Sequence, residues 1–218
     1  ESYVLRVASE VAAGLDHIYR RTHLVHRDIK PDNILTVPAT DHPEADLFER
    51  HDTAKLIDFG LARSYTHDER LTMTGVAMGT PHYMSPEQIR GSQDVDLRSD
   101  IYGIGATMFH LLTGRTPYRG SSPGAVMTAH VTEAVPDPGE LVPGLNPATR
   151  SLVTMCMAKE PGDRYLNYHA FITACHHALE AINGKGGNLR LLRKPLVLNR
   201  GKRARGKPGA ASAPRPAA

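Results

Sequence analysis

The chain has 218 residues, of which 40% are hydrophobic and 22% charged, a balance typical of a protein that folds around one core. No run approaches the roughly 18 apolar residues that cross a membrane, and the first residues lack the features of a signal peptide. The two cysteines, Cys156 and Cys175, lie far apart on apolar patterns and indicate buried thiols in a reducing compartment. We therefore expect a cytoplasmic protein, with a membrane anchor outside this sequence left open.

The net charge of +3 conceals two oppositely charged parts. Residues 1–180 hold 16 Lys and Arg against 23 Asp and Glu, whereas residues 181–218 hold 10 basic residues and no acidic ones. The tail over 183–218 is rich in Gly, Pro, Ala and basic residues and has too few apolar side chains to fold, so we expect it to be disordered. We interpret it as a solvated linker, with contact to nucleic acid or to an anionic surface as the weaker alternative.

Hydrophobic periodicity predicts the elements of the first half of the chain. Apolar residues at helical spacing predict an amphipathic helix from about 3 to 21. Short apolar runs at 34–35 and 55–57 predict a small pair of strands, joined by a surface loop over 36–54. Residues 61–84 show little periodicity and predict a long irregular segment of the kind that often carries function.

Three more helices are predicted in the second half. A strongly apolar stretch over 99–112 stops just before Gly114, which is the pattern of a buried helix with a C-terminal glycine. Asn-Pro at 146–147 supplies an N-cap and a first-turn proline for a helix that ends near 157. A last helix is predicted over about 167–181.

Three signatures carry chemical meaning, namely HRDIKPDN at 26–33, DFG at 58–60 and SPE at 85–87. HRD alone would be read as a charge cluster at the end of a helix, but the three together in this order are very unlikely to arise by chance. Phosphoryl transfer needs positioned charges and metal ligands more than a covalent catalyst, and these signatures supply both. The side-chain oxygens of Asn33 and Asp58 are hard ligands of the kind that Mg²⁺ prefers.

With the further motifs KLIDFGLAR, GTPHYMSPE, SDIYGIG and EPGDR, the sequence resembles the protein kinase family over about residues 1–180, specifically the large C-terminal lobe of a bacterial-type serine/threonine kinase. The resemblance implies an α+β parent fold, of which residues 1–182 form the mainly α-helical large lobe with a small β hairpin at the catalytic edge. It also implies an enzyme that uses ATP and Mg²⁺ to phosphorylate the Ser and Thr hydroxyls of protein substrates.

The resemblance assigns roles to the residues of the reaction site. Asp28 accepts the proton of the substrate hydroxyl, and Lys30 neutralises charge on the transferring phosphate, which favours Ser and Thr over Tyr as acceptors. Asn33 and Asp58 hold the metal and the nucleotide phosphates. Leu35, just after Asn33, forms part of the apolar floor beneath the adenine.

Other residues are expected to regulate or support this site. The arginine of the family that corresponds to Arg27 pairs with a phosphate on the activation loop. Thr72 and Thr74 lie where related bacterial kinases are autophosphorylated. Thr80 is expected to shape the substrate pocket. The structural residues implied by the resemblance are Glu87 paired with Arg164, and Asp100 as the anchor of the catalytic-loop backbone.

Three parts of a complete kinase have no counterpart in the sequence: the glycine-rich loop, the strand-borne lysine and the helix glutamate that pairs with that lysine. Only 25 residues precede His26, and one predicted helix takes them up. We therefore expect the chain to be part of a longer protein that carries the small lobe. The alternative is a catalytically inactive lobe that acts as a protein-binding module.

Overall fold

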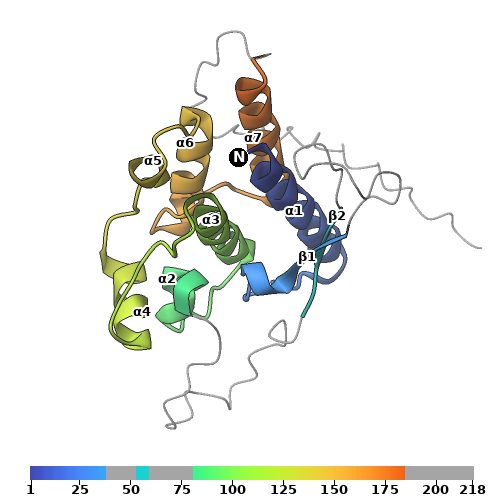
Figure 1. Ribbon diagram of the computed structural model, residues 1–218. Helices are drawn as coiled ribbons and strands as arrows, with labels where there is room; N and C mark the ends of the chain where they lie inside the picture. Colours follow the sequence, from blue (N-terminus) through green and yellow to red (C-terminus); the bar gives the residue numbers. More distant parts are fainter. Residues whose placement is uncertain (38–52, 59–80, 185–218) are drawn as a thin grey trace, which may run out of the picture.

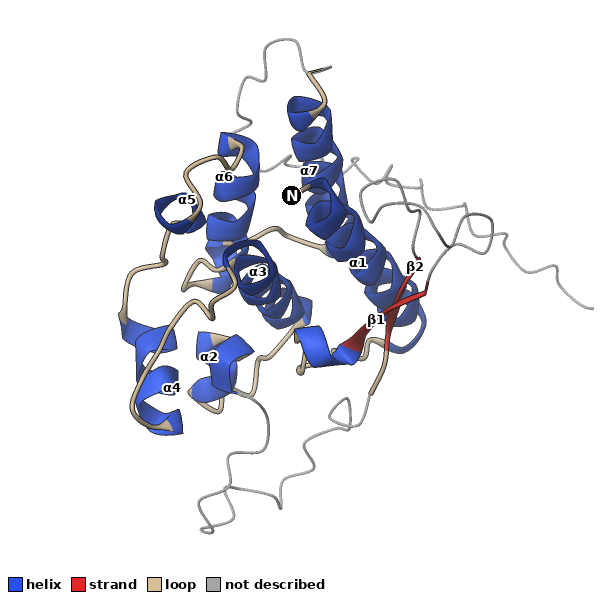
Figure 2. Cartoon of the chain, viewed as in Figure 1, coloured by secondary structure: helices blue, strands red, loops and turns tan. Residues whose placement is uncertain are grey.

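The computed structural model describes residues 1–37, 53–58 and 81–184. Within them the chain is mainly helical, with one two-stranded antiparallel sheet (Figures 1 and 2). The elements are α1 (Ser2–Thr22), β1 (Ile34–Val37), β2 (Thr53–Leu56), α2 (Pro86–Ile89), α3 (Leu97–Thr113), α4 (Pro123–Thr132), α5 (Pro138–Leu141), α6 (Pro147–Cys156) and α7 (Tyr168–Ile182), with short 3₁₀ turns at Pro31–Asn33, Pro81–Tyr83 and Pro161–Asp163.

Helix α3 is the centre of the core, and α1, α6 and α7 lie around it (Figure 1). Every residue from Ser99 to Phe109 is buried, which is typical of a helix that is covered on all sides. Two glycines allow close contacts: a Cβ at Gly103 would lie 3.0 Å from the Cβ of Ile29, and one at Gly105 would lie 2.5 Å from that of Cys156. The SDIYGIG motif therefore brings α3 directly against the segment at 26–33 and against α6.

The helices predicted from periodicity are confirmed to within two residues at their ends. Helix α3 begins at Leu97 because the Asp96 side chain accepts a hydrogen bond from the backbone N–H of Arg98. It ends at Gly114, which adopts the left-handed conformation with φ 70°. The Asn146 side chain caps α6 as predicted. No helix is predicted at α2, α4 or α5, although each has a capping side chain followed by proline.

The predicted strand pair is also confirmed. β1 and β2 pair antiparallel with Ile34 opposite Leu56, and both side chains pack against the core. The Glu10 carboxylate of α1 accepts a hydrogen bond of 2.6 Å from the backbone N–H of Ala54, so the hairpin is fixed to α1. The connection at 38–52, the segment at 59–80 and the tail over 185–218 lie outside the described residues.

Both cysteines are buried as free thiols, as predicted. Burial raises the pKa of Cys175 to about 12 and moves the pKa of Cys156 in the same direction, so neither side chain forms the reactive thiolate readily. Across 1–37, 53–58 and 81–184, none of the helices combines the length and the apolar character needed to cross a membrane.

His130 of α4 is fully buried among aromatic side chains. Its Nδ1 lies 2.7 Å from the Tyr102 hydroxyl, and its ring meets that of Tyr118 edge-on at 4.7 Å between centroids. Burial lowers the pKa of His130 to about 4, and the nearby charge of Lys159 acts in the same direction. The imidazole is therefore neutral at physiological pH.

The buried His130 predicts a loss of stability in acid. The pKa of His130 is about 4 in the folded protein and has its ordinary value of 6.5 in the unfolded chain. Between these pH values the unfolded chain therefore binds more protons than the folded one. The unfolding free energy is therefore highest above pH 6.5 with respect to this group, and it falls by about 3 kcal/mol in total as the pH drops toward 4. In urea titrations at several pH values, the native protein should lose more unfolding free energy on acidification than the variant His130→Gln. Parallel losses in the two proteins would contradict this prediction.

Candidate active site

The segment at 26–33 connects α1 to the hairpin and carries the first signature. Helix α1 ends at Thr22, and the next residue, His23, has a left-handed backbone (φ 55°) that turns the chain away from the helix axis. The following residues run beside α3, where Ile29 contacts Gly103, and the segment closes in the 3₁₀ turn Pro31–Asn33. The signature therefore lies between the central helix and the sheet.

Asp100 of α3 holds the backbone of this segment. Its Oδ2 accepts a hydrogen bond from the N–H of His26 at 2.9 Å, and its Oδ1 accepts one from the N–H of Arg27 at 2.7 Å. The Tyr168 hydroxyl of α7 donates to Oδ2 at 2.8 Å. Burial raises the pKa of Asp100, while the three donors favour its ionised form. The carboxylate thus joins α3, α7 and the segment at 26–33.

His26 links this segment to the end of β2. The side chain is 1% exposed, its Nδ1 lies 3.3 Å from the N–H of Asp28, and its Nε2 lies 3.4 Å from the carbonyl oxygen of Ile57. The tautomer with its proton on Nε2 satisfies both contacts, with Nδ1 accepting and Nε2 donating. His26 therefore has a structural role in positioning Asp28.

Asp28, Lys30 and Asn33 form one hydrogen-bonded cluster. Lys30 Nζ donates to Oδ2 of Asp28 at 2.8 Å, and the side-chain exposures of the two residues are 17% and 13%. Asn33 Nδ2 donates to the backbone carbonyl of Asp28 at 2.8 Å and to the same Oδ2 at 3.1 Å. Both side chains therefore use one carboxylate oxygen of Asp28, and neither uses Oδ1.

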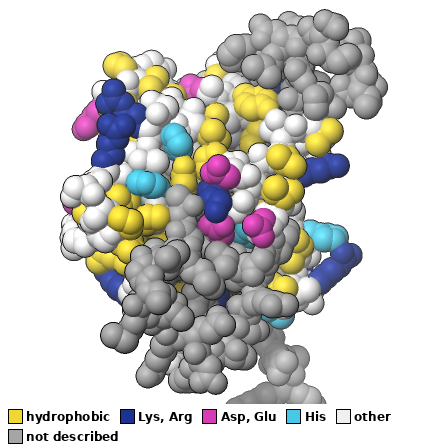
Figure 3. All heavy atoms as spheres, turned by 60° about the horizontal axis from the view of Figure 1, so that its bottom comes forward, with side chains coloured by type: hydrophobic (Ala, Val, Ile, Leu, Met, Phe, Trp, Pro, Cys, Tyr) yellow, Lys and Arg dark blue, Asp and Glu magenta, His cyan; other side chains and the backbone are white. Residues whose placement is uncertain are grey.

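The hairpin brings Asp58 close to this cluster along the backbone. Just beyond β2, the N–H of Ile57 donates to the carbonyl of Asn33 at 2.9 Å, and Asp58 follows with a left-handed backbone (φ 61°). Leu35, the second residue of β1, is 50% exposed. Acidic and basic side chains lie side by side near the middle of the face that forms the bottom of Figure 1 (Figure 3). The predicted metal ligands thus come from adjacent strand ends.

Three predicted site residues lie outside the described residues. They are Thr72, Thr74 and Thr80. Phe59 and Gly60 of the second signature lie there as well, so the part of that signature that the structure places is Asp58.

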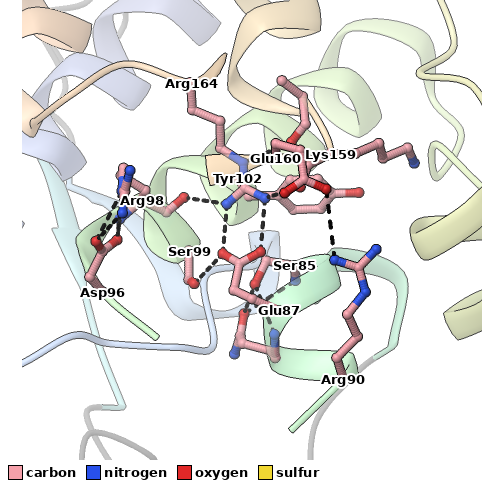
Figure 4. A network of polar contacts seen from close by, with 12 residues as sticks. Ser85, Glu87, Arg90, Asp96, Arg98, Ser99, Tyr102, Lys159, Glu160 and Arg164 are labelled. Atoms are coloured by element: carbon pink, nitrogen blue, oxygen red, sulfur yellow. Dashed lines mark hydrogen bonds and ion pairs between the residues drawn. The ribbon is translucent and has the colours of Figure 1, made fainter. Parts of the chain in front are cut away.

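Glu87 and Arg164 form a buried, bidentate ion pair (Figure 4). The guanidinium donates to the two carboxylate oxygens at 2.6 and 2.8 Å, and Ser99 of α3 donates to the same carboxylate. Burial alone would raise the pKa of Glu87, but Arg164 and Ser99 together hold it below its ordinary value. Further N–H groups of the guanidinium reach the backbone carbonyls of Arg98, Ala158 and Lys159. The pair therefore joins α2 to α3 and to the approach to α7.

Sequence reasoning misses two residues that support the segment at 26–33, Tyr168 through Asp100 and Gln88 by direct contact. Tyr168 donates to Asp100 across 68 positions of sequence, and nothing in the local pattern around it indicates this contact. Gln88 contacts the backbone of Arg27. Its place in the capping box that begins at Ser85 is readable from the sequence, but its distant partner is not.

The cluster is suited to proton transfer next to a negatively charged group. It combines a partly buried carboxylate, an ammonium group in contact with it and hard oxygen ligands on adjacent strand ends. The model of the protein kinase domain matches residues 1–178. The chain belongs to the protein kinase family. The order and spacing of the three signatures agree with this family membership.

The kinase chain is similar to several bacterial serine/threonine-protein kinases. It is 37% identical over 176 residues to pkn3 of Myxococcus xanthus, which covers 78% of this chain and 30% of that protein. It is 37% identical over 173 residues to PknH of Mycobacterium bovis (79% and 26%) and 33% identical over 217 residues to PknD of Mycobacterium tuberculosis (95% and 30%). The kinase chain thus spans 26% to 30% of the length of these curated relatives.

Proposed function

We propose that the full-length protein is an ATP- and Mg²⁺-dependent serine/threonine protein kinase, with residues 1–182 as the large lobe of its kinase domain. The observation that carries this proposal is the cluster of Asp28, Lys30 and Asn33, in which two donors share Oδ2 of the aspartate. Family membership and the names of the relatives support it. The glycine-rich loop and the strand-borne lysine of the small lobe are proposed to come from residues outside this chain.

In this proposal Asp28 is the general base. Its Oδ2 is held by Lys30 and Asn33, which leaves Oδ1 to accept the proton of a substrate hydroxyl and to orient that oxygen for attack. The Lys30 ammonium, 2.8 Å from Asp28, also neutralises negative charge on the transferring phosphate. Both residues act by position and charge, as phosphoryl transfer requires.

The described residues fit Mg²⁺ and a nucleotide. Asn33 uses its amide nitrogen toward Asp28, so its amide oxygen is the atom suited to a metal, and Asp58 offers a carboxylate from the adjacent strand end. Mg²⁺ is usually coordinated by one or two protein side chains together with phosphate oxygens and waters, and Asn33 and Asp58 would supply two such ligands. A bound Mg²⁺ would neutralise charge on the phosphates. The exposed Leu35 is proposed to contact the adenine.

Phosphate transfer by the full-length protein tests this function. The protein is incubated with Mg²⁺, ATP labelled on the γ-phosphate and a mixture of unfolded proteins, and the labelled amino acids are identified after hydrolysis. We expect label on serine and threonine, and its loss when Mg²⁺ is chelated. Label on tyrosine alone would contradict the assignment to serine and threonine. A folded protein that transfers no label but binds partners would favour the catalytically inactive binding module.

We further propose that phosphorylation of Thr72 and Thr74 activates the kinase through Arg27, while Thr80 shapes the substrate pocket. A phosphate paired with the guanidinium forms charge-assisted hydrogen bonds that order a loop. Replacing Thr72 and Thr74 together with alanine should lower kcat by at least about tenfold, the equivalent of one such bond.

Two exposed helical threonines provide the matched control for this experiment. The double variant Thr154→Ala/Thr173→Ala should keep the native rate, since each side chain is exposed and donates to the carbonyl oxygen four residues earlier in its own helix. Mass spectrometry should find phosphate on Thr72 or Thr74 in active protein. Fully active protein with neither threonine phosphorylated would overturn this regulation.

A further inference from the structure

The peptide that leads into Asp28 has a strained backbone. Arg27 adopts the left-handed conformation with φ 68°, which side chains with a Cβ rarely occupy. Such a conformation persists where the surrounding structure fixes it, and here each end of the residue is bonded to a different helix. Asp100 of α3 accepts from the N–H of Arg27 at 2.7 Å. The carbonyl oxygen of Arg27 accepts from Nε2 of Gln88 in α2 at 2.8 Å, across 61 positions of sequence.

The amide of Gln88 is oriented by a second set of bonds. Its Oε1 accepts from the backbone N–H of Ser85 at 3.2 Å and from the Ser85 hydroxyl at 3.0 Å. The backbone N–H of Ser85 can only donate and the carbonyl of Arg27 can only accept, so the amide end at Ser85 is the oxygen and the end at Arg27 is the NH₂ group. Because Ser85 is fully buried, this orientation is fixed by the core.

Helix α2 itself is firmly attached. Glu87, the neighbour of Gln88, forms the buried ion pair with Arg164, and Ser99 of α3 donates to the same carboxylate (Figure 4). The side chain of Gln88 therefore extends from a helix that is bonded to α3 and to Arg164, and its NH₂ group faces the carbonyl of Arg27. A glutamine on a mobile turn could not hold a strained peptide in this way.

We propose that Gln88 is a positioning residue of the kinase reaction. By donating to the Arg27 carbonyl, it fixes the peptide that precedes Asp28 and completes the attachment that Asp100 begins at the N–H of the same residue. Two helices thereby hold the general base in place, and neither Gln88 nor Asp100 touches the reacting atoms. This inference rests on the proposed function and adds a residue to it.

The substitution Gln88→Glu separates the two tasks of this side chain. Glutamate is as good as glutamine at this position of a capping box, so the bonds from Ser85 and the stability of α2 are kept. Its ionised carboxylate has no proton to donate to the Arg27 carbonyl. In the full-length protein we expect a fall in kcat of at least about tenfold, with the KM for ATP close to native and the variant still folded at the assay temperature.

A matched control is available five positions further on. Gln93 is exposed, and Gln93→Glu makes the same change of charge at the surface, so its kcat should stay native. Hydrogen exchange supplies a readout that does not depend on catalysis: the amides of Arg27 and Asp28 should exchange faster in Gln88→Glu, while those inside α3 keep their protection. If Gln88→Glu does not fold, Gln88→Met, which has a similar shape and no charge, should show the same loss.

The outcomes distinguish this inference from the proposed function. A native protein that transfers no phosphate would defeat the function, whereas the exchange experiment would still report on the Arg27 peptide. An active native protein, with native kcat and native exchange rates in both Gln88 variants, would overturn the positioning role alone. A loss of kcat equal to the loss in Gln93→Glu would also overturn it, since charge would then be the cause.

Discussion

Replacing Asp28 with asparagine is expected to lower kcat for phosphate transfer by about 10²- to 10⁴-fold, the usual contribution of a positioned general base. The two donors that share Oδ2, Lys30 and Asn33, should hold the amide oxygen of the new side chain in the same place. The amide NH₂ group would then occupy the position of Oδ1. A donor would replace the atom that accepts the proton, while the cluster kept its shape.

The loss should therefore appear in the chemical step. Single-turnover measurements with saturating Mg²⁺ and ATP should show a slower transfer in Asp28→Asn, with the affinity for the nucleotide little changed. Asp94→Asn makes the same chemical change at an exposed position and should transfer phosphate at the native rate. Undiminished transfer by Asp28→Asn would remove the general base from the proposal.

The largest effect on stability is expected from Arg164→Leu. This change leaves the buried carboxylate of Glu87 without its cation and removes the donors to three backbone carbonyls. Breaking a buried ion pair by removing one partner typically costs about 3 to 5 kcal/mol, a large share of the roughly 5 to 15 kcal/mol that stabilises a domain. Urea titrations should show this loss of unfolding free energy.

A surface pair in the same region provides the control. Arg90 lies 4.0 Å from Glu160, and both side chains are largely exposed (Figure 4). Exposed pairs contribute little, so Arg90→Leu should change the unfolding free energy by less than about 1 kcal/mol. The double variant Glu87→Leu/Arg164→Leu should lose less than the sum of its single changes, because it leaves no unpaired buried charge. An Arg164→Leu protein as stable as Arg90→Leu would show that the pair is dispensable.

The elements that could be predicted are those with a strong local signal. Helices α1 and α7 have long apolar patterns, and α3 and α6 also have a terminal glycine or an asparagine cap. Helix α4 was harder to predict because Gly124 lies in its first turn and its apolar residues do not gather on one face. Helices α2 and α5 have four residues each, too few to show a period.

The contacts of the candidate site likewise fall into two groups, those within a local motif, which could be predicted, and those between distant residues, which could not. The bonds among Asp28, Lys30 and Asn33 span at most five positions, so a local motif can encode them. The contacts of Tyr168 with Asp100 and of Gln88 with Arg27 join residues that meet only after α7 and α2 have packed. A hydrogen bond across such a distance depends on the arrangement of whole helices, and a single sequence carries no local mark of it.

A structure of the full-length protein with Mg²⁺ and a non-hydrolysable ATP analogue tests the central claim most directly. We expect the amide oxygen of Asn33 and the carboxylate of Asp58 to lie about 2.1 Å from the same metal site, with Oδ1 of Asp28 facing the γ-phosphate. A nucleotide bound away from these residues, or a metal held without Asn33 and Asp58, would contradict the account.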